Sequence, residues 1–158
     1  MIRLVILSFL IALPIGPLPV EKAGFWHGVG VQIDGFEWPM SVEIFEDTAS
    51  VDYPSLNCGG DWDYLKTSDA SITAIERITY GINECLDGGL VKIEIYDDHS
   101  LFYRWFDKSG KAVAGVILIE GELRMENYDA LLDLTIQAVG NYFIEGPTAR
   151  IDMGDDKI

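Results

Sequence analysis

The residues that could do chemistry in this chain are few: two histidines, two cysteines and several neighbouring carboxylates. Neither His27 nor His99 belongs to a recognisable catalytic motif. There is no G-x-S-x-G, H-E-x-x-H or phosphate-binding loop. We interpret His27 as an outward strand residue and His99 as part of a polar turn, and we predict no catalytic residue.

Paired carboxylates could act as acid and base on a sugar. Asp61 and Asp63 share one face of a predicted strand, and Asp97 and Asp98 share a turn. With 26 acidic residues in the chain, such pairs arise by chance. The acidic segments "DDHS" and "DMGDD" match no calcium-loop spacing. We therefore interpret these groups as solvated, predict no metal or cofactor, and place an enzyme third among the functional hypotheses.

The two cysteines, Cys58 and Cys85, are predicted to form a disulfide, because an even pair in an exported chain usually does. A redox or metal pair is the alternative, but no C-x-x-C spacing supports it. A bridge over a loop of this length stabilises a fold by about 3 kcal/mol in the chain-entropy picture. Cys58 lies in "VDYPSLNCGGDWDY", which we interpret as a structural joint between strands.

Aromatic residues provide the remaining signal. Trp62 and Tyr64 alternate along one predicted strand, and Tyr103 and Trp105 along another. This pattern lines either a packed barrel core or a ligand cavity. These four residues are the candidate ligand-binding residues.

Short turn signals and period-two alternation predict the elements that must position these side chains. The eight expected strands are Phe25 to Ile33, Met40 to Phe45, Ala49 to Tyr53, Gly60 to Lys66, Ile72 to Tyr80, Leu90 to Tyr96, Leu101 to Phe106 and Ala112 to Ile119. Connections such as "DGFEWP" and "DDHS" are too short for parallel crossovers. The fold class is therefore all-β, an eight-stranded antiparallel meander closed into a barrel.

A C-terminal helix over residues 127–143 should follow the barrel. Its expected apolar stripe is Tyr128, Leu132, Ile136, Val139 and Phe143, which would lie on the barrel wall. Thr148 to Met153 could form a last short strand.

The N-terminus has the pattern of a secretory signal. Arg3 precedes an apolar run from Leu4 to Leu13, and prolines interrupt that run too early for a membrane span. We expect a signal peptide over residues 1–23, cleaved between Gly16 and Ala23, and a single domain over 24–158. The expected location is secreted or periplasmic, without a stable membrane anchor.

The formal net charge is −15. Such a chain repels nucleic acid phosphates and anionic membrane surfaces, so neither is an expected partner. A basic protein partner is compatible with this charge.

The elements "YPSLNCGGDW" and "ERITYGINECLDGGLVKI" resemble a small bacterial extracytoplasmic domain that occurs alone and in the outer portions of actinobacterial protein kinases. The likeness extends from about Trp26 to Leu118. It implies a cysteine-bridged β domain and no particular reaction.

A second resemblance lies in "GFWHG", whose G-x-W is similar to the opening of lipocalin-like barrels. It implies that Trp26 closes one end of the barrel, under an arginine such as Arg124. The later T-D-Y element of lipocalins is missing.

Together these observations favour an exported, non-enzymatic binding module for a small apolar ligand. The alternative is a secreted interaction or inhibitor domain whose acidic surface meets a basic protein.

Overall fold

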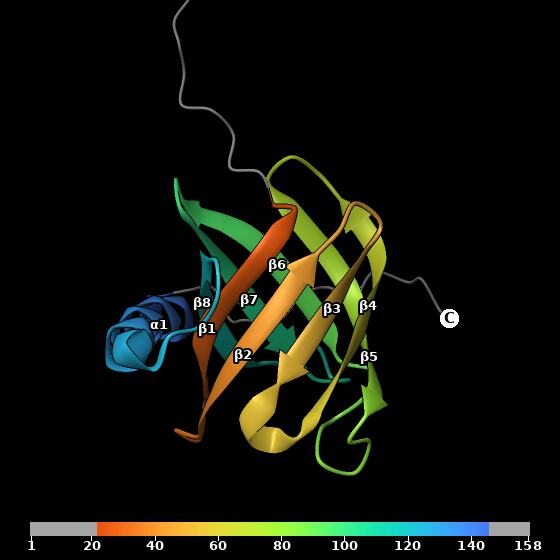
Figure 1. Cartoon of the computed structure of the whole chain (residues 1–158), viewed down its shortest axis with the longest axis horizontal. Coiled ribbons are helices and arrows are strands. Elements are labelled where there is room, and N and C mark those ends of the chain that lie inside the picture. The colour runs from red at the N-terminus through yellow and green to blue at the C-terminus, as the bar shows by residue number, and fades with distance from the viewer. Residues whose placement is uncertain (1–21, 146–158) are drawn as a thin grey trace, which may run out of the picture.

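A computed structural model describes residues 22–145 as a closed β-barrel with one helix on its outside (Figure 1). The predicted fold class is confirmed. The strands are β1 (Gly24–Gln32), β2 (Glu37–Ile44), β3 (Thr48–Tyr53), β4 (Cys58–Thr67), β5 (Ser71–Tyr80), β6 (Leu90–Asp97), β7 (Ser100–Phe106) and β8 (Ala112–Glu120). Short 3-10 turns at Pro54–Leu56 and Met125–Asn127 precede β4 and the helix α1 (Tyr128–Glu145).

Each strand pairs antiparallel with the next, and β1 pairs with β8 to close the barrel. Alternation along each strand sends one set of side chains inward and the other outward. In β2, for example, Trp38, Met40, Val42 and Ile44 are buried while the residues between them are partly exposed. The inward sets of all eight strands form one core.

The connection "DGFEWP" is shorter than expected, because β2 begins at Glu37 rather than Met40. Trp38 and Pro39 already pair with Gly30 and Val29 of β1. The strand tolerates Pro39 because β2 pairs with β3 only from Ser41 onward, which leaves one side of the proline without a partner strand.

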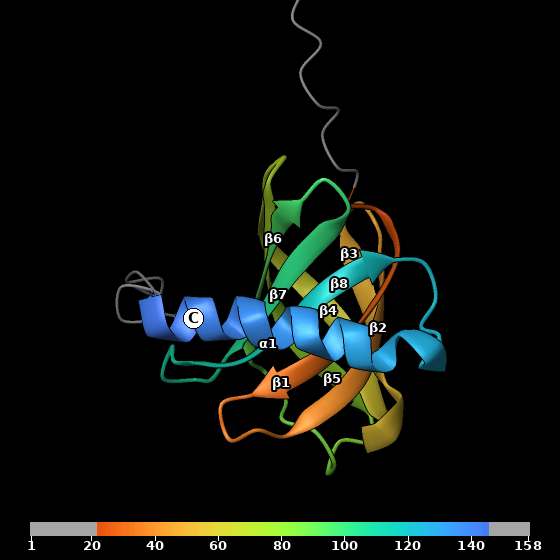
Figure 2. The same ribbon diagram turned by 90° about the vertical axis from the view of Figure 1, so that its left-hand side faces the viewer.

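The helix α1 crosses the outer faces of β1 and β8 (Figure 2). The expected stripe is partly wrong: Ile136 is exposed, and the buried face consists of Leu131, Thr135, Ala138 and Val139. A hydrogen bond selects this face, since Ile117 N–H of β8 donates to the Thr135 hydroxyl over 3.0 Å.

A close approach selects the same face of the helix. A Cβ atom at Gly115 would lie 2.7 Å from Val139 Cγ2, so only glycine lets the helix come this near to β8.

Trp26 is 1% exposed and lies near the start of β1, at the end of the barrel here called the closed end. Its indole N–H donates to the backbone carbonyl of Lys22 over 2.8 Å. The Lys22 ammonium group in turn donates to the carbonyls of Ser68 and Asp69, at 2.5 and 2.7 Å. The segment before β1 therefore crosses this end and ties it to the β4–β5 turn.

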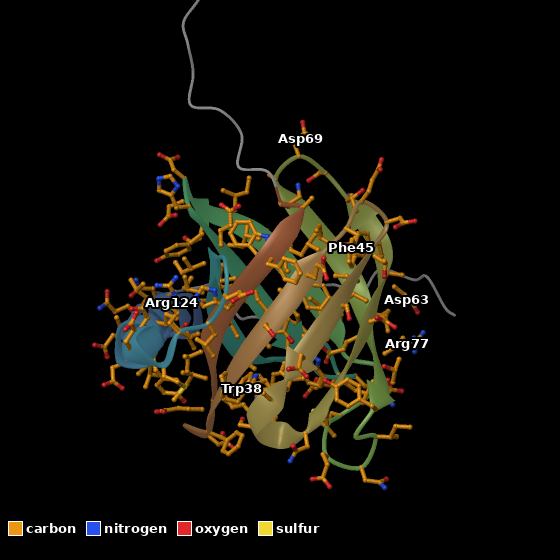
Figure 3. All side chains as sticks on the ribbon, viewed as in Figure 1. Trp38, Phe45, Asp63, Asp69, Arg77 and Arg124 are labelled. Carbon is orange, nitrogen blue, oxygen red and sulfur yellow. A yellow bond between two sulfur atoms is a disulfide. The ribbon has the colours of Figure 1, made fainter. Side chains whose placement is uncertain are left out.

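Arg124 does not cover Trp26, contrary to expectation. Its side chain is exposed, lies beside α1 (Figure 3) and approaches Glu126 at 3.9 Å. The backbone carbonyl of Lys22, rather than an arginine, contacts the Trp26 indole.

The predicted disulfide joins Cys58 at the start of β4 to Cys85 in the β5–β6 loop, with a Cα–Cα distance of 6.2 Å. Within residues 22–145, no helix is long and apolar enough to cross a bilayer. The expected signal segment up to Glu21 and the expected strand Thr148 to Met153 lie outside the described residues.

Candidate binding cavity

A cavity of about 160 Å³ opens at the end of the barrel where β1 ends and β2 begins, away from Trp26 near the start of β1. Trp38, labelled at this end in Figure 3, forms part of its wall. Further residues that line it come from the turn before β4 and from the β5–β6 loop, here called the mouth loop (residues 81–89). The aromatic and acidic residues of the lining are Trp38, Tyr53, Tyr103, Trp105, Glu76 and Glu84.

Glu76 is the unexpected member of this set, because it carries a carboxylate into the barrel interior. It lies on β5 between Ala74 and Ile78, in the register that points inward, and its exposed fraction is only 3%. A buried carboxylate is costly unless hydrogen bonds compensate for the lost water.

Three neutral donors supply that compensation. The Tyr53 hydroxyl donates to Glu76 Oε1 over 2.5 Å, and the Trp62 indole N–H donates to the same oxygen over 3.2 Å. The Trp105 indole N–H donates to Oε2 over 3.0 Å. We call these three donors together with Glu76 the carboxylate cage.

Tyr103 contacts two members of the carboxylate cage, Tyr53 and Trp62. Its hydroxyl lies 3.2 Å from the Tyr53 hydroxyl. Because Tyr53 uses its only proton on Glu76, Tyr103 is the donor of this second bond. The Tyr103 ring also stacks on Trp62, with ring centroids 5.7 Å apart, which fixes both side chains.

Burial sets the protonation behaviour of the cage. Burial raises the pKa of Glu76, and the nearby Asp87 carboxylate raises it further. The hydrogen bonds from Tyr53, Trp62 and Trp105 lower this pKa and so offset part of the rise. Burial and the nearby Glu76 charge also raise the pKa of Tyr53 well above its ordinary value of 10.0. The Tyr53 phenol therefore remains a hydrogen-bond donor.

The carboxylate of Glu76 can accept further hydrogen bonds. Each of its oxygens can accept two hydrogen bonds, and among the described residues Oε2 receives only that of Trp105. None of the ion pairs in the described part of the chain includes Glu76. The buried Arg104 lies on the outer wall, where it pairs with Glu94 and stacks over the Tyr142 ring.

The mouth loop is tied to the cage at its end. Glu76 N–H donates to the Gly89 carbonyl, and Gly88 N–H donates to the Glu76 carbonyl, both over 2.9 Å. A Cβ atom at Gly89 would lie 2.0 Å from the Trp105 ring, so a side chain there would displace the indole. The disulfide holds the middle of the loop through Cys85, which also lines the cavity.

The four predicted binding residues do not all meet at one place. Trp62, Tyr103 and Trp105 come together around Glu76, and Tyr103 and Trp105 line the cavity. Tyr64 lies at the other end, where its hydroxyl donates to the Thr48 carbonyl over 2.6 Å. Tyr64 therefore has a structural position and does not line the cavity.

The remaining candidate groups lie away from the cavity. His27 points outward, is buried, and holds the Gly121 carbonyl through Nδ1 over 2.7 Å. Asp63 forms an exposed ion pair with Arg77 at 3.0 Å on the outer wall (Figure 3). Among the described residues, no group of three or more His, Cys, Asp or Glu side chains is arranged to hold a metal ion.

Glu76 was missed from the sequence, although a signal existed. In "SITAIERITY" the inward positions Ile72, Ala74 and Ile78 enclose Glu76 at the same period of two. A charged residue in an otherwise apolar inward register indicates a buried polar group.

Comparison with known proteins assigns no family. No protein-family model matches the chain, and no curated protein matches it in sequence. One solved structure, described as a redesigned beta barrel, aligns with 13% sequence identity and a TM-score of 0.44, covering 63% of this chain and 91% of that one.

Proposed function

We propose that the protein is an exported, non-enzymatic binding module whose barrel holds one small, mainly apolar ligand. The observation that carries the proposal is the cavity of about 160 Å³, with four aromatic residues in its lining and a hydrogen-bonding carboxylate at its base. Such a combination of apolar walls and few polar groups is typical of ligand sites. A cavity of about 150 Å³ is known to admit benzene, so the expected ligand has the size of one aromatic ring.

Tryptophan fluorescence can test this proposal, because the indoles of Trp38 and Trp105 line the cavity and that of Trp26 lies at the closed end. Single-ring probes such as benzyl alcohol should change the emission of the native protein. Trp105→Phe should reduce this change, and the double variant Trp38→Phe with Trp105→Phe should remove most of it, since both indoles line the cavity. The matched control, Trp26→Phe, should keep it.

An emission change that survives in the double variant Trp38→Phe with Trp105→Phe and disappears in Trp26→Phe would place the ligand elsewhere. If calorimetry also detects no binding of single-ring probes, the proposal fails. The alternative would then lead: capture of a basic protein by the acidic surface, weakening steeply with salt.

The proposed location is secreted or periplasmic. The Cys58–Cys85 bond supports an oxidising, non-cytosolic environment. Lys22 participates in the closed end, so we expect cleavage of the signal before Lys22. The intact mass of the exported protein would measure this, and a mature chain that begins at Gly24 would contradict it.

We also propose a lipocalin-like arrangement for the barrel. In its support, Trp26 stands near the start of β1 at the closed end and the cavity lies at the other. The disulfide is compatible with the bacterial extracytoplasmic domain that the two cysteine elements resemble.

A further inference from the structure

We propose that the ligand of this cavity is a small organic amine, held as its ammonium ion by the Glu76 carboxylate and the surrounding aromatic rings. This inference rests on the proposed binding function and adds the charge of the ligand.

The first support is the unused acceptor at the base of the cavity. Tyr53 and Trp62 donate to Oε1 of Glu76, whereas within residues 22–145 Oε2 accepts a hydrogen bond from Trp105 alone. All three donors are neutral, so they leave the carboxylate without a counter-charge. A ligand N–H bearing a positive charge would supply both the missing hydrogen bond and the counter-charge.

The second support is the charge of the lining. Glu84 is a second acidic residue of the cavity lining, and no lysine or arginine occurs among the described residues of that lining. An anionic ligand would meet only like charge there. A neutral ligand would leave the charge of the buried Glu76 uncompensated.

The third support is the aromatic walls. Indole and phenol rings attract a cation over their faces, with tryptophan the most effective. Trp38, Trp105, Tyr53 and Tyr103 all line the cavity that Glu76 enters. Together with a carboxylate, such rings form the surroundings in which proteins bind organic ammonium ions.

Three probes of nearly equal size separate the possibilities: benzylamine, benzyl alcohol and benzoate, titrated into the native disulfide-bonded protein at one pH and salt concentration. Calorimetry should show benzylamine binding at least about tenfold more tightly than benzyl alcohol, since it adds a charge-assisted hydrogen bond. Benzoate should bind most weakly.

Equal or tighter binding of benzyl alcohol would overturn the amine inference and leave the proposed binding function intact. Binding of none of the three probes would overturn both. Tightest binding of benzoate would overturn the amine inference and indicate that Glu76 does not face the ligand as a charged group.

Three variants test which carboxylate causes the preference for benzylamine over benzyl alcohol. Glu76→Gln keeps the size of the side chain and should reduce the preference for benzylamine over benzyl alcohol to about twofold or less. Glu84→Gln removes no hydrogen bond of the carboxylate cage. It should lower the preference for benzylamine only slightly. Glu43→Gln removes the same charge from the outer face of β2 and should leave the preference unchanged. A preference that persists in Glu76→Gln would contradict the assignment.

Discussion

The two ends of the barrel use the same kind of side chain in opposite ways. At the closed end, the indole N–H of Trp26 donates to a backbone carbonyl, and the ring fills the interior. At the cavity end, the indole N–H of Trp105 donates to a carboxylate, and the ring forms a wall. Both ends belong to one core, but the first is completed by apolar packing and the second includes a buried carboxylate with its hydrogen-bond donors.

The difference shows how a small barrel can combine a rigid core with a cavity. Trp26 is sealed by an extended segment that reaches across the barrel through Lys22. The cage around Glu76 holds Tyr53, Trp62 and Trp105 in fixed positions through directional hydrogen bonds. Because Tyr53 and the two tryptophans point at one carboxylate, they are less free to move into the empty volume.

The largest expected effect on stability comes from truncating Trp26 at the closed end. Trp26→Ala should lower the free energy of unfolding by about 3 to 5 kcal/mol, as truncation of large buried aromatic side chains generally does. Urea denaturation measures the loss. The ratio of benzylamine to benzyl alcohol affinity should stay constant in the folded variant, because the cavity lies at the other end. A changed ratio would show that the two ends are coupled.

The disulfide should have the next largest effect, and it should act on the cavity end. The double variant Cys58→Ser with Cys85→Ser is expected to lose about 3 kcal/mol of unfolding free energy. Its affinity for single-ring probes should also fall, since Cys85 lines the cavity. Reduced wild-type protein is the control for the substitutions. Unchanged stability after both treatments would refute the role of the bridge as a joint.

The smallest expected effect is a pH dependence of the folding stability that arises from Glu76 in the carboxylate cage. Burial raises the pKa of Glu76 in the folded protein above its ordinary 4.5, so the native state holds this proton more tightly than the unfolded state. The stability that this provides is fully present below pH 4.5 and is lost as pH rises through the folded pKa. As pH rises above 4.5, wild-type protein should therefore lose more stability than Glu76→Gln.

Thermal denaturation across this pH range tests the difference, with Glu43→Gln as the surface-charge control. Asp97 and Asp107 do not confuse the result, because hydrogen bonds from Ser100 and Ser109 lower the pKa of each below its ordinary 3.8. Those two groups lose their contribution only at more acidic pH. Parallel curves for wild type and Glu76→Gln would contradict a raised pKa.

Much of the fold could be predicted because alternation and short turns are local signals. They located eight strands, the helix and a cysteine pair that meets in space. The face of α1 could not be predicted, because it depends on Thr135 meeting a free N–H of Ile117 and on Val139 fitting over Gly115. These are contacts between distant segments, which helical periodicity alone does not encode.

The candidate site was predicted in part for the same reason. Trp62, Tyr103 and Trp105 were recognisable as inward residues, but their common partner Glu76 was not, since acidic residues are normally placed outside. Tyr64 follows the alternation yet lies toward the opposite end of β4, because two positions along a strand separate side chains by almost 7 Å.

The attachment of Gly88 and Gly89 to the backbone of Glu76 has a consequence for how this protein could diversify. The mouth loop is anchored there and at Cys85, so substitutions at Ile82, Glu84 or Leu86 can alter the entrance without moving the carboxylate. If the proposed binding function holds, selection, natural or in the laboratory, can thus change which molecules are admitted while Glu76 and its hydrogen-bond donors are inherited unchanged.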